Sequence, residues 1–123
     1  MTTFSSTWLS LREPRDALSR SRRMVRSLRR LLSDRPIQIT DLASGTGANL
    51  RFVAEALGGR QNWSLIDHDR ALLDAIPRRM QDWAARCGAS VTQSGPEIII
   101  QGQSFECRAR ISVSYTHLRA HET

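Results

Sequence analysis

Apolar residues recur at three- and four-residue steps near the start of the chain. The pattern covers residues 14–32, and its apolar members are Leu18, Met24, Val25, Leu28, Leu31 and Leu32. This spacing places them on one face of an amphipathic α-helix. Pro14 suits a first helical position, because its missing N–H would have no partner there. We expect the helix to end before Pro36, since the residue before a proline avoids helical geometry.

The next stretch alternates strands with helices. Residues 37–42 predict a short strand and residues 43–47 a glycine-containing turn, and the helix that follows has an apolar face of Leu50, Val53, Ala54 and Leu57. Gly58 and Gly59 should end this helix with a left-handed cap. Residues 63–66 predict a second strand, and Asp69 can cap the helix behind it.

That second helix should bury an apolar face of Leu72, Leu73, Ile76, Met80, Trp83 and Ala84, with a kink at Pro77 and an end at Gly88. Strand, helix, strand and helix in this order imply βαβ crossovers and a parallel sheet. From Ala89 onward the pattern changes to short β-like runs at 90–93, 97–101 and 105–113, separated by turn residues. We expect a hairpin-like β region there.

Composition supports a single globular domain. The chain has 123 residues, of which 40% are hydrophobic and 24% charged. Its longest purely apolar run, residues 98–100, is far shorter than the roughly 18 residues of a membrane span, and no secretory signal is visible at the start. Cys87 and Cys107 stand far apart and suggest small core residues in a reducing compartment. We therefore expect a cytoplasmic protein that does not contact a membrane.

The formal net charge of +6 raises the question of a nucleic-acid partner. All 18 basic residues are arginines, and several gather between Arg20 and Arg30. Such a run is more often the solvated face of a helix than a phosphate-binding surface, which would usually contain lysine as well. An arginine-rich nucleic-acid-binding module remains the alternative to the reading below.

The most informative segment is residues 37–49, a strand followed by an acidic residue, a glycine turn and a helix start. Gly45 and Gly47 allow the backbone to approach a ligand, and the helix N-terminus behind them offers N–H donors. A dinucleotide fingerprint would need a third glycine where Leu50 stands, and a P-loop would need Gly-Lys-Ser/Thr. Neither motif is present.

Residues 41–47, Asp-Leu-Ala-Ser-Gly-Thr-Gly, resemble motif I of the class I S-adenosylmethionine-dependent methyltransferases. Ala43 replaces the usual first glycine, which is tolerable only if its φ is negative. The resemblance implies an α/β fold with a partial Rossmann-like, doubly wound parallel sheet. It also implies that Asp41 reaches the methionine end of S-adenosyl-L-methionine, while Gly45 and Gly47 pass beneath its sulfonium and ribose.

The second strand ends in Asp67, as motif II of that family requires, and a carboxylate there can accept both ribose hydroxyls. Asp41 and Asp67, each at a strand's carboxyl end, should open on one crevice. His68 could flank the adenine, although exposed histidines in turns more often have no functional role. Arg12 or Arg15 could reach the cofactor carboxylate, or both could be surface arginines of an arginine-rich protein. The candidate cofactor-binding residues are Asp41, Ala43, Ser44, Gly45, Thr46, Gly47, Asn49, Asp67, His68 and Arg12.

The resemblance leaves several parts of such an enzyme unassigned. It covers residues 8–111, within which residues 8–16 and 61–73 look like a bacterial subfamily. Neither Glu97 nor Glu106 is convincingly placed to hold the adenine amino group. We expect an N-terminal helical segment at 1–35, a truncated cofactor-binding domain at 36–112, and a tail at 113–123 that resembles translated adapter sequence.

The resemblance implies a fragment that we expect to be inactive alone, and no residue of the chain is assigned a catalytic role. The methyl acceptor and the oligomeric state are unknown from sequence, and no metal site is expected. The same fold could also serve aminopropyl transfer with a decarboxylated cofactor.

Overall fold

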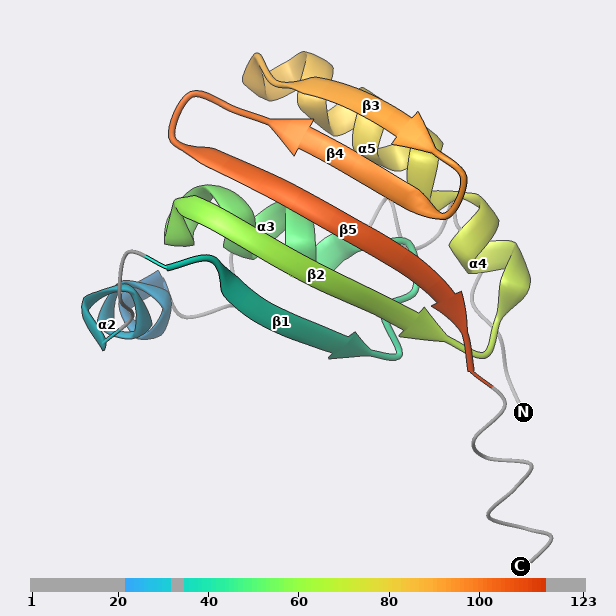
Figure 1. The fold of residues 1–123 in the computed structure, drawn as a ribbon, viewed down its shortest axis with the longest axis horizontal. Helices are drawn as coiled ribbons and strands as arrows, with labels where there is room; N and C mark the ends of the chain where they lie inside the picture. The colour runs from blue at the N-terminus through green and yellow to red at the C-terminus, as the bar shows by residue number, and fades with distance from the viewer. Residues whose placement is uncertain (1–21, 32–34, 115–123) are drawn as a thin grey trace, which may run out of the picture.

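The computed structural model describes residues 22–31 and 35–114 (Figure 1). Its elements are α2 (Arg22–Leu31), β1 (Ile37–Leu42), α3 (Ala48–Leu57), β2 (Gly59–Asp67), α4 (Arg70–Asp74), α5 (Ile76–Cys87), β3 (Ser90–Ser94), β4 (Glu97–Gln101) and β5 (Phe105–Val113). The predicted alternation of strands and helices is confirmed. Of the helix predicted at 14–32, only residues 22–31 lie in the described part.

The five strands form one mixed sheet in the order β1-β2-β5-β4-β3. β1 pairs parallel with β2, and β2 pairs parallel with β5, whereas β4 is antiparallel to both of its neighbours. The predicted hairpin is confirmed in β3 and β4. β5 joins the hairpin to the rest of the sheet, because it pairs antiparallel with β4 on one side and parallel with β2 on the other. Its pairing with β2 reaches Val113, so this residue belongs to the domain rather than to a tail.

Helices α3, α4 and α5 all lie behind the sheet in the view of Figure 1. Burial alternates along the strands accordingly: in β5, Cys107 and Ala109 are buried while Arg108 and Arg110 are exposed. Strands covered on both faces read as continuous apolar runs instead. Helices α3, α4 and α5 therefore cover the same face of the sheet. A helix layer on the other face, as in a doubly wound sheet, stays a prediction.

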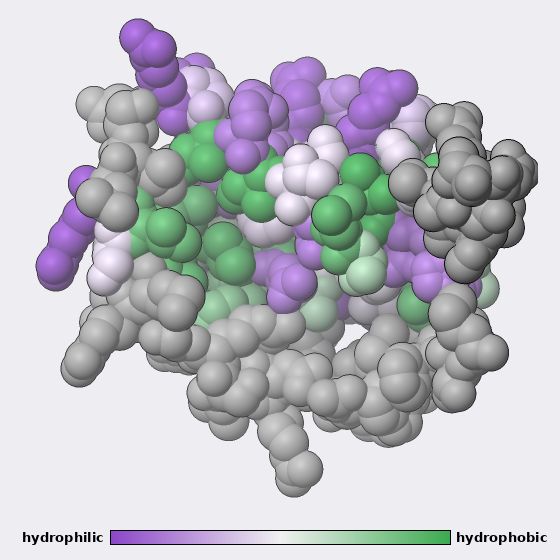
Figure 2. All heavy atoms as spheres, turned by 90° about the horizontal axis from the view of Figure 1, so that it is seen from below, coloured by the Kyte–Doolittle hydropathy of each residue, from purple (hydrophilic) through white to green (hydrophobic). Residues whose placement is uncertain are grey.

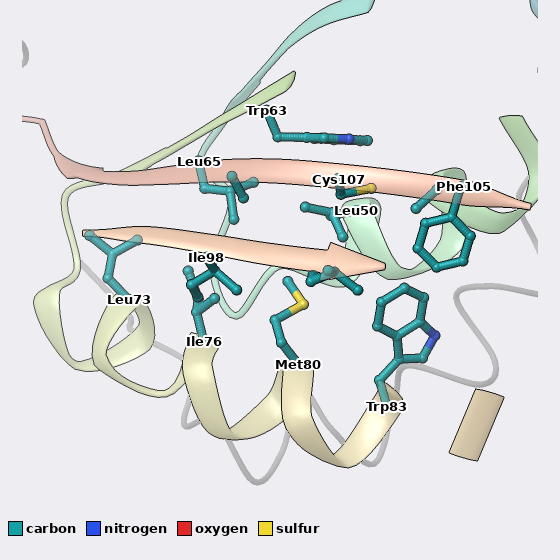
Figure 3. Packing of buried hydrophobic residues seen from close by; sticks show 13 residues of the cluster. Leu50, Trp63, Leu65, Leu73, Ile76, Met80, Trp83, Ile98, Phe105 and Cys107 are labelled. Carbon is teal, nitrogen blue, oxygen red and sulfur yellow. The ribbon is translucent and has the colours of Figure 1, made fainter. Parts of the chain in front are cut away.

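The core lies between this helix layer and the sheet (Figure 3). Met80 and Trp83 of α5 point toward the sheet, and the rings of Trp83 and Phe105 lie with centroids 5.6 Å apart. The other main contributors are Leu50, Trp63, Leu65, Leu73, Ile76, Ile98, Ile100, Cys107 and Ala109. The apolar faces predicted for α3 and α5 are thus largely confirmed, although Leu72 and Val53 are only partly buried.

The helix ends differ from expectation at two places. Pro77 lies in the first turn of α5, after a break at Ala75, so it begins a new helix instead of kinking one. A proline is favoured there because first-turn N–H groups lack helical partners. Gly58 has φ 71° and ψ 179°, which is not the predicted left-handed cap, whereas Gly88 does have left-handed geometry.

Helix α2 contacts α3, and Val25 of α2 is buried. Leu28, predicted on the same apolar face, is 48% exposed. The guanidinium of Arg29 lies beside Gly58, the residue between α3 and β2. Within the described residues, no helix combines the length and apolarity that crossing a bilayer would need.

Candidate functional site

Asp41 and Asp67 lie on neighbouring parallel strands at the same edge of the sheet. Asp41 of β1 is level with Leu65 of β2, so Asp67 follows just beyond it. Both side chains are more than nine-tenths buried. The prediction that the two aspartates lie at the carboxyl ends of adjacent parallel strands is confirmed, and both are buried. The shared crevice stays a prediction.

The turn between β1 and α3 alternates backbone handedness. Ala43, Gly45 and Gly47 have φ of 60°, 56° and 86°, whereas Ser44 and Thr46 are not in the positive range. The expectation of a negative φ at Ala43 is wrong: alanine here adopts the conformation in which glycine is favoured. An L-residue pays about 1–2 kcal/mol for this conformation because its Cβ crowds the following carbonyl oxygen.

Backbone hydrogen bonds hold this turn against the sheet. The N–H of Ser44 donates to the Ile66 carbonyl oxygen at 3.0 Å, and the N–H of Gly47 donates to the Ser44 carbonyl oxygen at 3.0 Å. Gly47 also packs closely: a Cβ there would stand 2.5 Å from Met80 Cε. The φ of 86° favours glycine at this position, and a Cβ there would also displace the end of the Met80 side chain.

Asp67 connects the turn to the second strand. Its Oδ2 accepts the N–H of Gly45 at 2.8 Å, and its Oδ1 accepts the N–H of Asp69 at 2.9 Å. His68, which is 41% exposed, places Nδ1 3.4 Å from the same Oδ1. A carboxylate offers about four acceptor sites, so Asp67 keeps acceptor capacity for ligand hydroxyls.

Asp41 is tied to the helix that follows the turn. Asn49 donates from Nδ2 to Asp41 Oδ1 at 3.3 Å, which links the first turn of α3 to the end of β1. Ser44 lies between the two carboxylates in sequence and is 6% exposed. Its Oγ has no hydrogen-bond partner among the described atoms, so this hydroxyl is a buried polar group that a ligand could satisfy.

Sequence reasoning missed Arg51, which lies in α3 and is only 4% exposed. Its Nη1 donates to the Thr46 carbonyl oxygen at 2.6 Å, and its Nη2 donates to Thr46 Oγ1 at 3.2 Å. The residue was passed over because a charged side chain in a helix is usually solvated.

The carboxyl end of β5 also reaches this edge. Ser114 donates its N–H to the Asp67 carbonyl oxygen at 2.9 Å, so the chain leaves β5 beside the site. Glu106 lies near the opposite end of β5, and Glu97 begins β4 and pairs with Arg108 at 3.0 Å. Glu106 is therefore far from the two aspartates along the strands. Glu97 is level with Arg110 and Ser64, near the carboxyl ends of β1 and β2, but β5 separates its strand from β2. The pairing of β5 with β2 was not predicted, because residues 105–113 were interpreted as part of a hairpin-like region.

Nine of the ten candidate residues are thus gathered around one turn and two strand ends, while Arg12 and Arg15 lie outside the described residues. Within residues 22–31 and 35–114, no cluster of three or more histidine, cysteine or acidic residues could hold a metal ion. A search of protein-family models found no match to this chain, and a search of curated proteins found none either.

Proposed function

We propose that this chain binds S-adenosyl-L-methionine at the carboxyl ends of β1 and β2 and forms the cofactor-binding part of a class I methyltransferase. The observation that carries the proposal is the hydrogen bond from the Gly45 N–H to Asp67 Oδ2. It joins the glycine turn after the first strand to the carboxylate that ends the second. These are the two motifs whose conjunction the resemblance rests on.

The charge of the site supports this ligand over a nucleotide phosphate. Successive N–H groups in a turn of alternating handedness can cradle an anion, but here Asp67 already takes the N–H of Gly45. A pyrophosphate would meet Asp67 and Asp41 and be repelled by both. S-adenosylmethionine instead carries a sulfonium, an ammonium and two ribose hydroxyls, all of which a carboxylate favours.

Each group has a role in this proposal. Asp67 accepts the ribose hydroxyls, and Asp41, held by Asn49, receives the methionine end. Gly45 and Gly47 let the backbone pass beneath the ribose and sulfonium. The buried Ser44 hydroxyl gains a partner. The bound cofactor supplies an activated methyl group, and this chain's residues hold and orient it.

Other site residues have supporting positions. Ala43 and Thr46 shape the turn, and His68 flanks the adenine beside Asp67 in this proposal. Arg12, which lies outside the described residues, is proposed to bind the cofactor carboxylate. No residue is assigned a catalytic role, and the acceptor of the methyl group is not assigned. We also propose a cytoplasmic setting, since Cys87 and Cys107 are both free thiols.

The test is calorimetric titration of the full chain with S-adenosylmethionine. Asp67→Ala should weaken binding by about 1.5–3 kcal/mol for each charged hydrogen bond lost, and Asp67→Asn, which keeps the shape, should also weaken it. Asp74→Ala, at an exposed position of α4, is the matched control and should bind like the wild type.

Equal affinity of the Asp67 variants and the wild type would refute the proposed role of this carboxylate. Affinity for DNA that falls steeply with salt and is indifferent to S-adenosylmethionine would favour the arginine-rich nucleic-acid module instead.

A further inference from the structure

Arg51 is a charged side chain in an unfavourable place. It is 4% exposed and lies one turn into α3. The positive end of the helix dipole is near its N-terminus and disfavours a cation there. Removing a guanidinium from water is also costly. An apolar residue of similar volume would often serve stability as well or better.

Arg51 makes two hydrogen bonds to one residue of the turn. Two guanidinium nitrogens reach Thr46, one to its carbonyl oxygen at 2.6 Å and the other to its hydroxyl at 3.2 Å. Nη1 also lies 4.0 Å from Met80 Sδ. The planar guanidinium therefore fixes both the backbone and the side chain of Thr46 in one orientation.

The turn is thus held from two sides. Asp67 binds the N–H of Gly45, and Arg51 binds Thr46, the next residue. Met80 fills the space against Gly47. With Gly45 anchored to β2 and Thr46 anchored to α3, the peptide between them has little freedom to rotate.

We propose that Arg51 is a positioning residue that holds the turn at 43–47 in the conformation that receives the cofactor. The cofactor part of this inference rests on the proposed function. Arg51 itself need not touch the ligand. Its contribution is to fix the backbone of Thr46, so that Gly45 and Gly47 present their backbone to the ligand without prior rearrangement.

The first test needs no cofactor. Amide hydrogen exchange measured by NMR should show the Gly45 and Gly47 amides exchanging about tenfold faster in Arg51→Met than in the wild type, because one charge-assisted anchor is lost. Amides of the core strands, such as that of Ala109, should change less. Arg51→Lys keeps one donor to Thr46 and should be intermediate.

Ile100→Val, a core change in β4, is the control for a merely structural role. It should accelerate turn and strand amides by a common factor, because it acts through global unfolding. Uniform acceleration in Arg51→Met as well would overturn the positioning role.

The second test is S-adenosylmethionine affinity. Arg51→Met should bind about tenfold more weakly, whereas Ile100→Val should bind like the wild type at temperatures where both are folded. Equal binding by Arg51→Met would overturn the cofactor part of the inference. If the wild type itself fails to bind, the proposed function falls, and the exchange experiment alone decides whether Arg51 positions the turn.

Discussion

Ala43 adopts a backbone conformation that glycine reaches at lower cost. Its φ of 60° brings the Cβ close to the following carbonyl oxygen. Ala43→Gly should therefore raise the free energy of unfolding by about 0.5–1 kcal/mol. The substitution relieves the backbone strain, and the greater conformational entropy of glycine in the unfolded chain offsets part of this gain. Urea unfolding measures this change.

Ala85→Gly is the matched control, because Ala85 is exposed within α5 and has helical geometry. Ala85→Gly should lower the free energy of unfolding by about 1 kcal/mol. The same substitution then has opposite signs at the two positions. A loss of stability in Ala43→Gly would show that the left-handed alanine carries no strain.

Cys107 gives the fold a dependence on alkaline pH. Burial raises its pKa from 9.0 to about 12, and the charge of Glu106 acts in the same direction. The folded chain thus keeps the thiol proton at a pH where the unfolded chain releases it. The thiol's stabilising contribution is complete below pH 9 and is lost as the pH rises toward 12.

Cys107 alone should reduce the free energy of unfolding by at most about 1.4 kcal/mol per pH unit above 9. Urea unfolding at about pH 8 and about pH 10 tests this, with Cys107→Ala as the variant that should show a flatter dependence. Identical pH dependence in the two proteins would contradict the assignment.

At the scale of elements, local patterning predicted most strands but not all of their extents. The bounds of β1, β4 and β5 agree with expectation, since apolar and turn residues delimit them clearly. β2 was predicted at 63–66 and spans Gly59–Asp67, because its polar first half is paired with β5. That pairing joins segments far apart in sequence, and no local pattern encodes it.

The helix predicted behind Asp69 is divided for a similar reason. Asp69 caps α4 as expected, accepting the N–H groups of Ala71 and Leu72 at 3.0 and 3.3 Å. The apolar spacing is nevertheless continuous across Ala75, so periodicity alone predicts one helix. Pro77 marks the boundary, and a proline is compatible both with a kink and with a helix start.

At the scale of the whole molecule, the sequence identified the turn and the two aspartates but not what surrounds them. Asp41 and Asp67 were predictable because the carboxyl ends of neighbouring parallel strands meet at one edge. Arg51 was not, since its contacts with Thr46 and with Met80 of α5 depend on how the chain folds around α3. The hydrogen bond from Ser114 to the Asp67 carbonyl oxygen was not predictable either, because it depends on the chain connection that brings β5 beside β2.

Both edges of the sheet lack a partner strand among the described residues, and they differ in character. β1 carries Ile37, Ile39 and Leu42, of which Leu42 is 73% exposed. Seen from below, the side of the β1 edge, apolar residues gather in the middle of the surface (Figure 2). β3, at the other edge, has the polar sequence Ser-Val-Thr-Gln-Ser.

An apolar edge strand with free N–H and C=O groups is a template for another chain. We therefore expect the protein to self-associate through β1, with a mean mass in sedimentation velocity that rises with concentration. Thr40→Lys, at an exposed position of β1, should shift the protein toward monomer, because two such edges would bring like charges together. Thr92→Lys, the equivalent change on β3, should associate like the wild type. A monomeric wild type, or equal effects of the two lysines, would show that the β1 edge is not what joins the chains.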